Sequence, residues 1–83
     1  TGLHERLDQY IAHHADRLQV VLGACIEPLS GVEVARFLFP QDLDLHGKFF
    51  AIGETMAHIR YLEHQGKLLR REDRKGVERY IKA

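Results

Sequence analysis

The segment GETMAHIRYLEHQGKLLRRED, Gly53–Asp73, decides the fold, because it joins a helical pattern, a stop signal and the start of a strand. Gly66 stands where a glycine in the left-handed conformation ends a helix. Upstream, the apolar side chains recur at steps of three and four, at Leu45, Phe49, Ile52, Met56, Ile59 and Leu62. The spacing predicts a helix over about residues 46–65, with one apolar side facing the core.

The residues after Gly66 predict a β-hairpin. The segments KLLRRE and VERYIK flank Asp73-Arg74-Lys75-Gly76, a charged turn. Its glycine can supply the positive φ that a hairpin loop needs at its end. The hairpin therefore follows the helix directly.

Two further helices are predicted upstream. Apolar residues from Leu3 to Cys25 recur at helical spacing over about six turns, which predicts the first helix. Ser30 and Glu33 then have the spacing of a capping box, so a second helix should begin near Gly31. Leu29 and Val34 have the spacing of a hydrophobic staple. Pro40 disfavours helical geometry at the residue before it and should keep the second helix short.

The order helix, helix, helix, hairpin predicts a mainly α fold with a small β-hairpin. This is a winged-helix-like arrangement, in which a two-stranded wing follows three helices, and residues 1–83 should form one domain. The residues expected to be buried are Leu18, Val21, Leu22, Ile52, Ile59 and Leu62, together with Cys25.

The charge of the chain is unevenly distributed. Lys+Arg and Asp+Glu are both 12, so the overall balance implies no polyanionic or polycationic partner. Residues 1–66 carry five Lys/Arg against nine Asp/Glu, and residues 67–83 carry seven against three. The predicted wing is thus a basic end on an acidic body. Its candidate residues for guiding an anionic substrate are Arg70, Arg71, Arg74 and Lys75. The alternative is that these charges are solvated or pair with the acidic body.

The sequence offers little catalytic chemistry. None of the six histidines lies three or four residues from another, so no helical pair of metal ligands is expected, and no metal site within this chain. Glu54 and His58 are i,i+4 partners that suit a general base and its orienting group, or an ion pair at a surface or interface. No nucleophile elbow or phosphate-binding glycine loop is recognisable. The sequence therefore predicts no catalytic residues.

Three features concern the cellular setting. Cys25 is the only cysteine, which excludes an internal disulfide and suits a reducing compartment. No apolar run approaches the roughly 18 residues of a membrane span. The chain opens in the middle of a helical pattern without Met, which suggests a piece of a longer protein. A cytoplasmic protein without membrane contact is the expectation.

A DNA-binding domain of a transcriptional regulator has the same order of elements. Its recognition helix needs cationic or amide side chains on the outward face. Off the apolar series, the helix over residues 46–65 offers two basic residues and two glutamates, with Thr55 and His58 among the other outward residues. Such a balanced surface is poorly suited to binding a polyanion such as DNA. An oligomerisation module is a third possibility, since Phe49-Phe50 can face a partner.

Four stretches resemble the C-terminal winged-helix domain of metallo-beta-lactamase-fold hydrolases. They are YIAHHADR (10–17), VARFLFP (34–40), GETMAHIRYL (53–62) and GKL (66–68). The resemblance covers essentially the whole chain. The family often has arginine after the first histidine of the first helix, where this chain has His14, while Arg17 keeps its place. Any contact that this arginine makes in the family is therefore in doubt here.

The resemblance implies an accessory domain of a metal-dependent hydrolase. The H-x-H-x-D-H motif that binds zinc or another divalent metal in that family lies on a preceding catalytic domain, which would be the main partner. Residues at the interface or lining the cleft would be His13, Arg17, Glu54 and His58. The family includes hydrolases of thioesters and small esters as well as enzymes that cut single-stranded RNA. An anionic small molecule or a single-stranded nucleic acid is thus the implied substrate.

Overall fold

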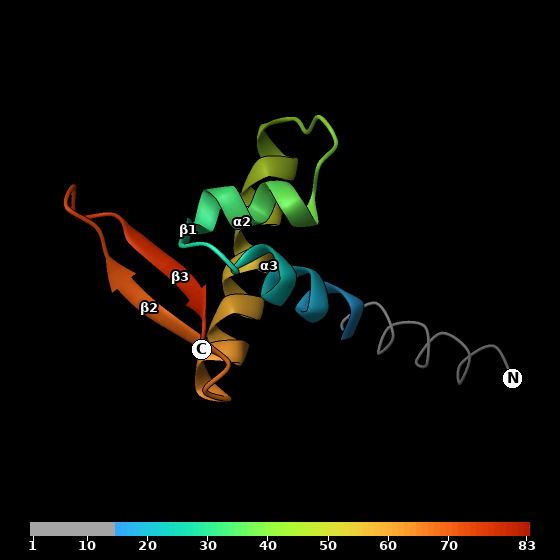
Figure 1. The fold of residues 1–83 in the computed structure, drawn as a ribbon. Helices are drawn as coiled ribbons and strands as arrows, with labels where there is room; N and C mark the ends of the chain where they lie inside the picture. The colour runs from blue at the N-terminus through green and yellow to red at the C-terminus, as the bar shows by residue number, and fades with distance from the viewer. Residues whose placement is uncertain (1–14) are drawn as a thin grey trace, which may run out of the picture.

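The computed structural model describes residues 15–83, which form three helices and a small antiparallel sheet (Figure 1). Residues 15–24 are helical, and the part of the predicted first helix before them lies outside the described residues. The elements that follow are β1 (Leu29–Ser30), α2 (Gly31–Leu38), α3 (Leu45–His64), β2 (Leu68–Glu72) and β3 (Glu78–Lys82). The predicted helices followed by a two-stranded wing are confirmed.

The predicted capping box begins α2. The Ser30 hydroxyl accepts a hydrogen bond from the Glu33 backbone N–H at 3.2 Å, and the Glu33 carboxylate accepts one from the Ser30 N–H at 3.1 Å. Leu29 and Val34, on either side of the cap, both belong to the hydrophobic core or pack against it. The helix ends at Leu38, two residues before Pro40, as expected.

Ser30→Ala should lower the free energy of unfolding by about 1 kcal/mol, because two backbone N–H groups at the start of α2 would lose a partner. Urea denaturation followed by circular dichroism measures the change. Ser30→Thr keeps the hydroxyl and serves as the control. An alanine variant as stable as the parent chain would mean that water replaces the cap without loss.

Both ends of α3 are capped by specific hydrogen bonds. At the start, the Asp44 carboxylate accepts a hydrogen bond from the Gly47 N–H at 2.7 Å. At the end, Gly66 has a φ of 72°, as predicted. The Gly66 N–H donates to the Glu63 carbonyl and the Lys67 N–H to the Leu62 carbonyl, both at 2.9 Å. This pair of bonds is the Schellman motif. It turns the chain directly from α3 into the wing.

The three strands pair in the order β1-β3-β2. In the wing, Arg70 lies opposite Tyr80, and Gly76 in the turn has a φ of 81°, which confirms the predicted role of this glycine. β1 was not predicted, because two residues are too short to show a strand pattern. It pairs with β3 through Leu29, opposite Tyr80, and so joins the wing to the start of α2.

The core lies where the first helix, α2, α3 and the wing meet. Its buried residues are Val21, Cys25, Val34, Ile59, Leu62, Leu68 and Tyr80. Leu18 and Leu22 are half-buried and pack against this cluster. The predictions for Val21, Cys25, Ile59 and Leu62 are therefore confirmed, and each helix contributes to one continuous core.

The predicted core face of α3 is wrong in the first half of the helix. Ile52 is 39 % exposed, and Leu45 and Phe49 are more exposed still. The buried residues of α3 are instead Ala51, Thr55, His58, Ile59 and Leu62. At 100° per residue, these residues centre roughly a quarter-turn away from the apolar series that the sequence suggested. Thr55 and His58, expected on the outward face, point into the molecule.

Two physical reasons explain the rotation of α3. The Thr55 hydroxyl donates to the Ala51 carbonyl at 2.7 Å, and the His58 ring nitrogen Nδ1 to the Glu54 carbonyl at 2.6 Å, so these polar groups are satisfied by the preceding turn. Small residues are also favoured where α2 packs closely on α3. A Cβ at Gly31 would lie only 2.9 Å from the Met56 sulfur. Leu45 and Phe49, in the first turns of α3, face outward.

Candidate functional site

Three of the four residues predicted at an interface lie together where the first helix meets α3. Arg17 Nη1 is 3.7 Å from Glu54 Oε2, and the Arg17 guanidinium lies 5.4 Å from the centre of the Phe39 ring. Arg17 thus links the first helix, the end of α2 and α3. His58 is one turn along α3 from Glu54. His13, the fourth residue, lies outside the described residues.

His58 occupies a buried position beside this ion pair, with 4 % of its surface exposed. A carbonyl oxygen only accepts hydrogen bonds, so the contact with the Glu54 carbonyl places a proton on Nδ1. The Glu54 carboxylate is directed to Arg17. This geometry is that of a packing histidine near an inter-helix ion pair.

Arg70 of the wing is held against the body of the domain. Its guanidinium donates two hydrogen bonds to the Glu63 carboxylate, at 3.0 and 3.1 Å, and lies 3.7 Å from the Glu78 carboxylate. It also lies 5.9 Å from the centre of the Tyr80 ring. Arg70 therefore braces the wing on α3.

Arg79 makes a second brace between the wing and α2. Its guanidinium donates to Asp73 at 2.9 Å and to Glu33 at 2.7 Å. The hydrogen bond from Arg79 and those from the Val77 and Lys75 N–H groups hold the pKa of Asp73 below its usual value. Hydrogen bonds from Ser30, followed by the one from Arg79, likewise lower the pKa of Glu33. One guanidinium thus ties the hairpin turn to the capping box.

Arg79→Met should destabilise the domain near neutral pH and have less effect in acid. A carboxyl whose folded pKa is lowered stabilises the fold above its unfolded pKa, and that contribution is lost as the pH falls through the folded value. The difference in unfolding free energy between the parent chain and Arg79→Met should shrink from about pH 7 to about pH 3, below the unfolded pKa of Asp and Glu. Denaturation at both pH values tests this. Arg36→Met, at an exposed site, is the control; an equal gap at both pH values contradicts the assignment.

The other cations of the wing are exposed. Arg71 projects from β2, and Arg74 and Lys75 lie in the turn. Within residues 15–83, these three side chains make no ion pair. These three cations near the hairpin turn are therefore available to a partner.

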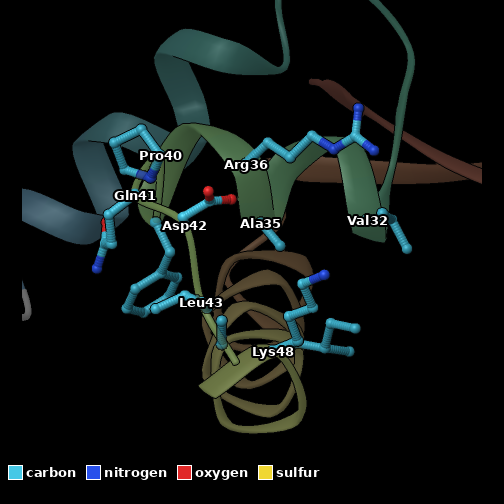
Figure 2. A pocket seen from close by; sticks show the side chains of 11 residues that line it. Val32, Ala35, Arg36, Pro40, Gln41, Asp42, Leu43 and Lys48 are labelled. Carbon is cyan, nitrogen blue, oxygen red and sulfur yellow. The ribbon is translucent and has the colours of Figure 1, made fainter. Parts of the chain in front are cut away.

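A separate hollow of about 480 Å³ lies between α2, the loop after it and the start of α3 (Figure 2). Its walls are largely apolar and include Val32, Ala35, Phe39, Leu43 and Ile52. Arg36 and Lys48 face it together with Asp42, so charges of both signs surround it. This mixture does not define a site for an ion of either sign.

The described part of the chain contains no group of three or more His, Cys, Asp or Glu side chains that can hold a metal ion.

Cys25, the sole thiol, is buried, and burial raises its pKa to about 11, which disfavours the reactive thiolate. No helix within residues 15–83 has the length and apolar character needed to cross a membrane.

Several contacts at these sites were not foreseen from the sequence. Arg70 and Glu63 are seven residues apart, on either side of the α3–β2 turn, and Arg79 and Glu33 are 46 residues apart. The Asp44 cap had a visible signal, an aspartate three residues before Gly47 at the start of a helical pattern. The long-range pairs had no such signal, because they depend on how the wing docks.

The fold and the ion pairs of Arg70 and Arg79 define a small helical domain with a basic wing that is held against the helices. A family profile described as metallo-beta-lactamase-like, C-terminal domain, matches residues 18–83. The chain belongs to this family.

Two solved structures are closely similar. The chain is 38 % identical to a beta-lactamase domain protein from Burkholderia ambifaria, with a TM-score of 0.89. It is 30 % identical to a metallo-beta-lactamase family protein from Thermus thermophilus, with a TM-score of 0.78. Each match covers 95 % of this chain, but only 24 % and 23 % of the two longer chains. The comparison with curated proteins found no significant match.

Proposed function

We propose that this domain is the accessory C-terminal part of a metal-dependent hydrolase, where it braces the catalytic domain and lines one side of the substrate cleft. The family assignment of residues 18–83 carries the proposal. The domain spans about a quarter of two similar proteins, which are described as a beta-lactamase domain protein and a metallo-beta-lactamase family protein. The buried, single Cys25 agrees with a cytoplasmic hydrolase.

The proposed metal, zinc or another divalent ion, belongs to the catalytic domain and not to this chain. Within residues 15–83 the potential ligands do not converge, which agrees with a metal site on the catalytic domain. Its contribution is to position the catalytic domain and to shape access to the cleft. The ion pair of Arg17 and Glu54, with His58 packed beside it, would stiffen the part of the domain nearest the incoming chain.

The alternative, a DNA-binding regulator, receives little support from the surface of α3. The outward side of this helix carries Phe49, Phe50, Gly53 and Ala57, with His46 and Arg60 beside them. The first four side chains neither neutralise phosphates nor hydrogen-bond to bases, and one arginine is a small positive charge for a polyanion. A protein interface suits them better than a DNA groove.

The hydrolase proposal is tested on the natural full-length protein. We expect it to hydrolyse an ester or phosphodiester bond, to lose that activity with a chelator and to regain it when a divalent metal is restored. The isolated 83-residue domain should be inactive under all these conditions. Activity that survives complete removal of metal would oppose the proposal.

The basic wing is proposed to guide an anionic substrate, such as a nucleic-acid strand or a small phosphorylated ester. Arg71, Arg74 and Lys75 carry this role, because Arg70, the fourth predicted residue, is engaged with Glu63 and Glu78. In the full-length protein, Arg71→Glu with Arg74→Glu should raise KM for an anionic substrate roughly tenfold at low salt. KM for a neutral ester should be unchanged. The difference should shrink as ionic strength rises, since salt screens exposed charges.

Lys82→Glu is the matched control for the wing. It makes the same change of charge as Arg71→Glu or Arg74→Glu alone, in the same hairpin but at the end of β3 away from the turn. Its effect on KM should be clearly smaller than that of either reversal near the turn. If the double variant changed KM equally for the charged and the neutral substrate, the guiding role would be wrong and the wing charges would be merely solvated.

A further inference from the structure

One side of α3 presents apolar side chains to solvent, with exposed His46 and Arg60 beside them. Phe49 is 68 % exposed and Phe50 is 63 % exposed. Between them on the helix surface lie Gly53 and Ala57, both exposed, and a Cβ at Gly53 would meet nothing within 4 Å. We call Phe49, Phe50, Gly53 and Ala57 the outward face of α3. It opposes the face that carries Ala51, Thr55 and Ile59 into the core.

The composition of this outward face is that of an interface. Two aromatic side chains flank two small residues, so a partner can approach the helix backbone closely while the rings bury a large apolar area. Exposed apolar groups gathered in this way usually mark a contact surface. Ile52, which lies beside Phe49 at an i,i+3 spacing, also lines the hollow seen in Figure 2. That hollow offers a recess for a side chain of the partner.

The course of the chain indicates which partner covers this face. The domain is C-terminal in its family, so a preceding catalytic domain would join it through the first helix. The described part of that helix begins beside α3, where Arg17 contacts Glu54. Glu54 follows Phe50 by four residues and therefore lies next to it on the helix surface. The preceding chain thus reaches the domain on the side that adjoins Phe50.

We propose that the outward face of α3 is the surface that packs against the preceding catalytic domain of the same polypeptide. This inference rests on the proposed function and assigns its contact surface. Three-quarters of the length of the similar chains lies outside the matched region, which is ample for a domain that can bury this face. The exposed cations of the wing, on β2 and in the hairpin turn, are not part of this surface.

Cysteine labelling tests the proposal in the natural full-length protein. Ala57→Cys keeps both phenylalanines and introduces one thiol at the centre of the outward face. Leu69→Cys, at an exposed site of β2, is the matched control. Native Cys25 is fully buried and should not be labelled. The modified residue is identified by mass spectrometry of peptides after treatment with N-ethylmaleimide, which also separates it from cysteines elsewhere in the protein.

In the 83-residue chain, Ala57→Cys and Leu69→Cys should label at similar rates. In the full-length protein, Ala57→Cys should label at least roughly tenfold more slowly than in the 83-residue chain, because packing excludes the reagent except during local opening. Leu69→Cys should keep its rate. Protection must be independent of protein concentration. A second probe, Gly53→Cys, should follow Ala57→Cys and guards against an effect peculiar to one variant.

Three outcomes would overturn the proposal. Equally fast labelling of both sites in the full-length protein would leave the outward face of α3 uncovered. Slow labelling already in the 83-residue chain would mean that the chain covers this face itself. Protection that appears only as concentration rises would assign the face to a second copy. None of these results depends on hydrolytic activity. The labelling assay tests the contact surface and the chelator assay tests the proposed function, so failure of one can be told from failure of the other.

Discussion

Ile59→Ala should lower the free energy of unfolding by about 2–5 kcal/mol, the range for truncating buried aliphatic side chains. Ile59 is fully buried and contributes to the core between the first helix and the wing. Removing its outer carbons leaves a cavity that neighbouring groups on four elements cannot easily fill. The loss is a large fraction of the stability of a small domain.

Ile52→Ala is the matched comparison, because it makes the same chemical change seven residues earlier in the same helix. Ile52 is 39 % exposed, so its truncation forfeits less burial. Alanine also has the higher helix propensity, which offsets part of the loss. We expect a change below about 1 kcal/mol in the isolated domain. Equal costs for the two variants in urea denaturation would contradict the orientation of α3 described above.

The contrast between Ile59 and Ile52 shows where the sequence pattern is insufficient. Both residues fit one helical apolar series, but α3 has large apolar side chains on more than one side. Its orientation is decided by what the neighbours require. Thr55 and His58 can be buried because the carbonyls of the preceding turn accept hydrogen bonds from them. Periodicity of apolar residues does not detect this, since it counts both as polar.

Local chemistry, in contrast, was predicted well. The capping box at Ser30, the end of α3 at Gly66 and the positive φ of Gly76 each depend on residues within a few positions of one another. Such contacts form in the same way wherever the segment is placed. The sequence therefore indicated the order of elements and their ends.

The candidate site was predictable only as a set of residues, not as an arrangement. The wing was correctly expected to be basic, yet the sequence did not distinguish Arg70, which braces the wing on Glu63, from exposed Arg71. Alternation along β2 places the two side chains on opposite faces of the hairpin. Which face packs on α3 depends on Leu68 and Tyr80, which are buried on the same side as Arg70.

Tyr80→Ala should be the most destabilising change in the wing, at about 3–5 kcal/mol, as for other large aromatic side chains removed from a core. Tyr80 is 2 % exposed and lies in β3, the central strand, opposite Leu29 on one side and Arg70 on the other. Its ring therefore contacts the core while lying below the guanidinium of Arg70. Thermal and urea unfolding measure the loss.

Tyr80→Phe separates the ring from its hydroxyl. The hydroxyl donates only a long hydrogen bond of 3.4 Å to the Glu78 carboxylate, so its removal should cost less than about 1 kcal/mol. A phenylalanine variant as unstable as the alanine variant would show that the hydroxyl, not the ring, holds the wing. With the ring identified as the anchor, Tyr80→Ala should also weaken the proposed guiding of anionic substrate in the full-length protein. Arg71 and Arg74 remain charged in that variant, but the hairpin that positions them would have lost its attachment to the core.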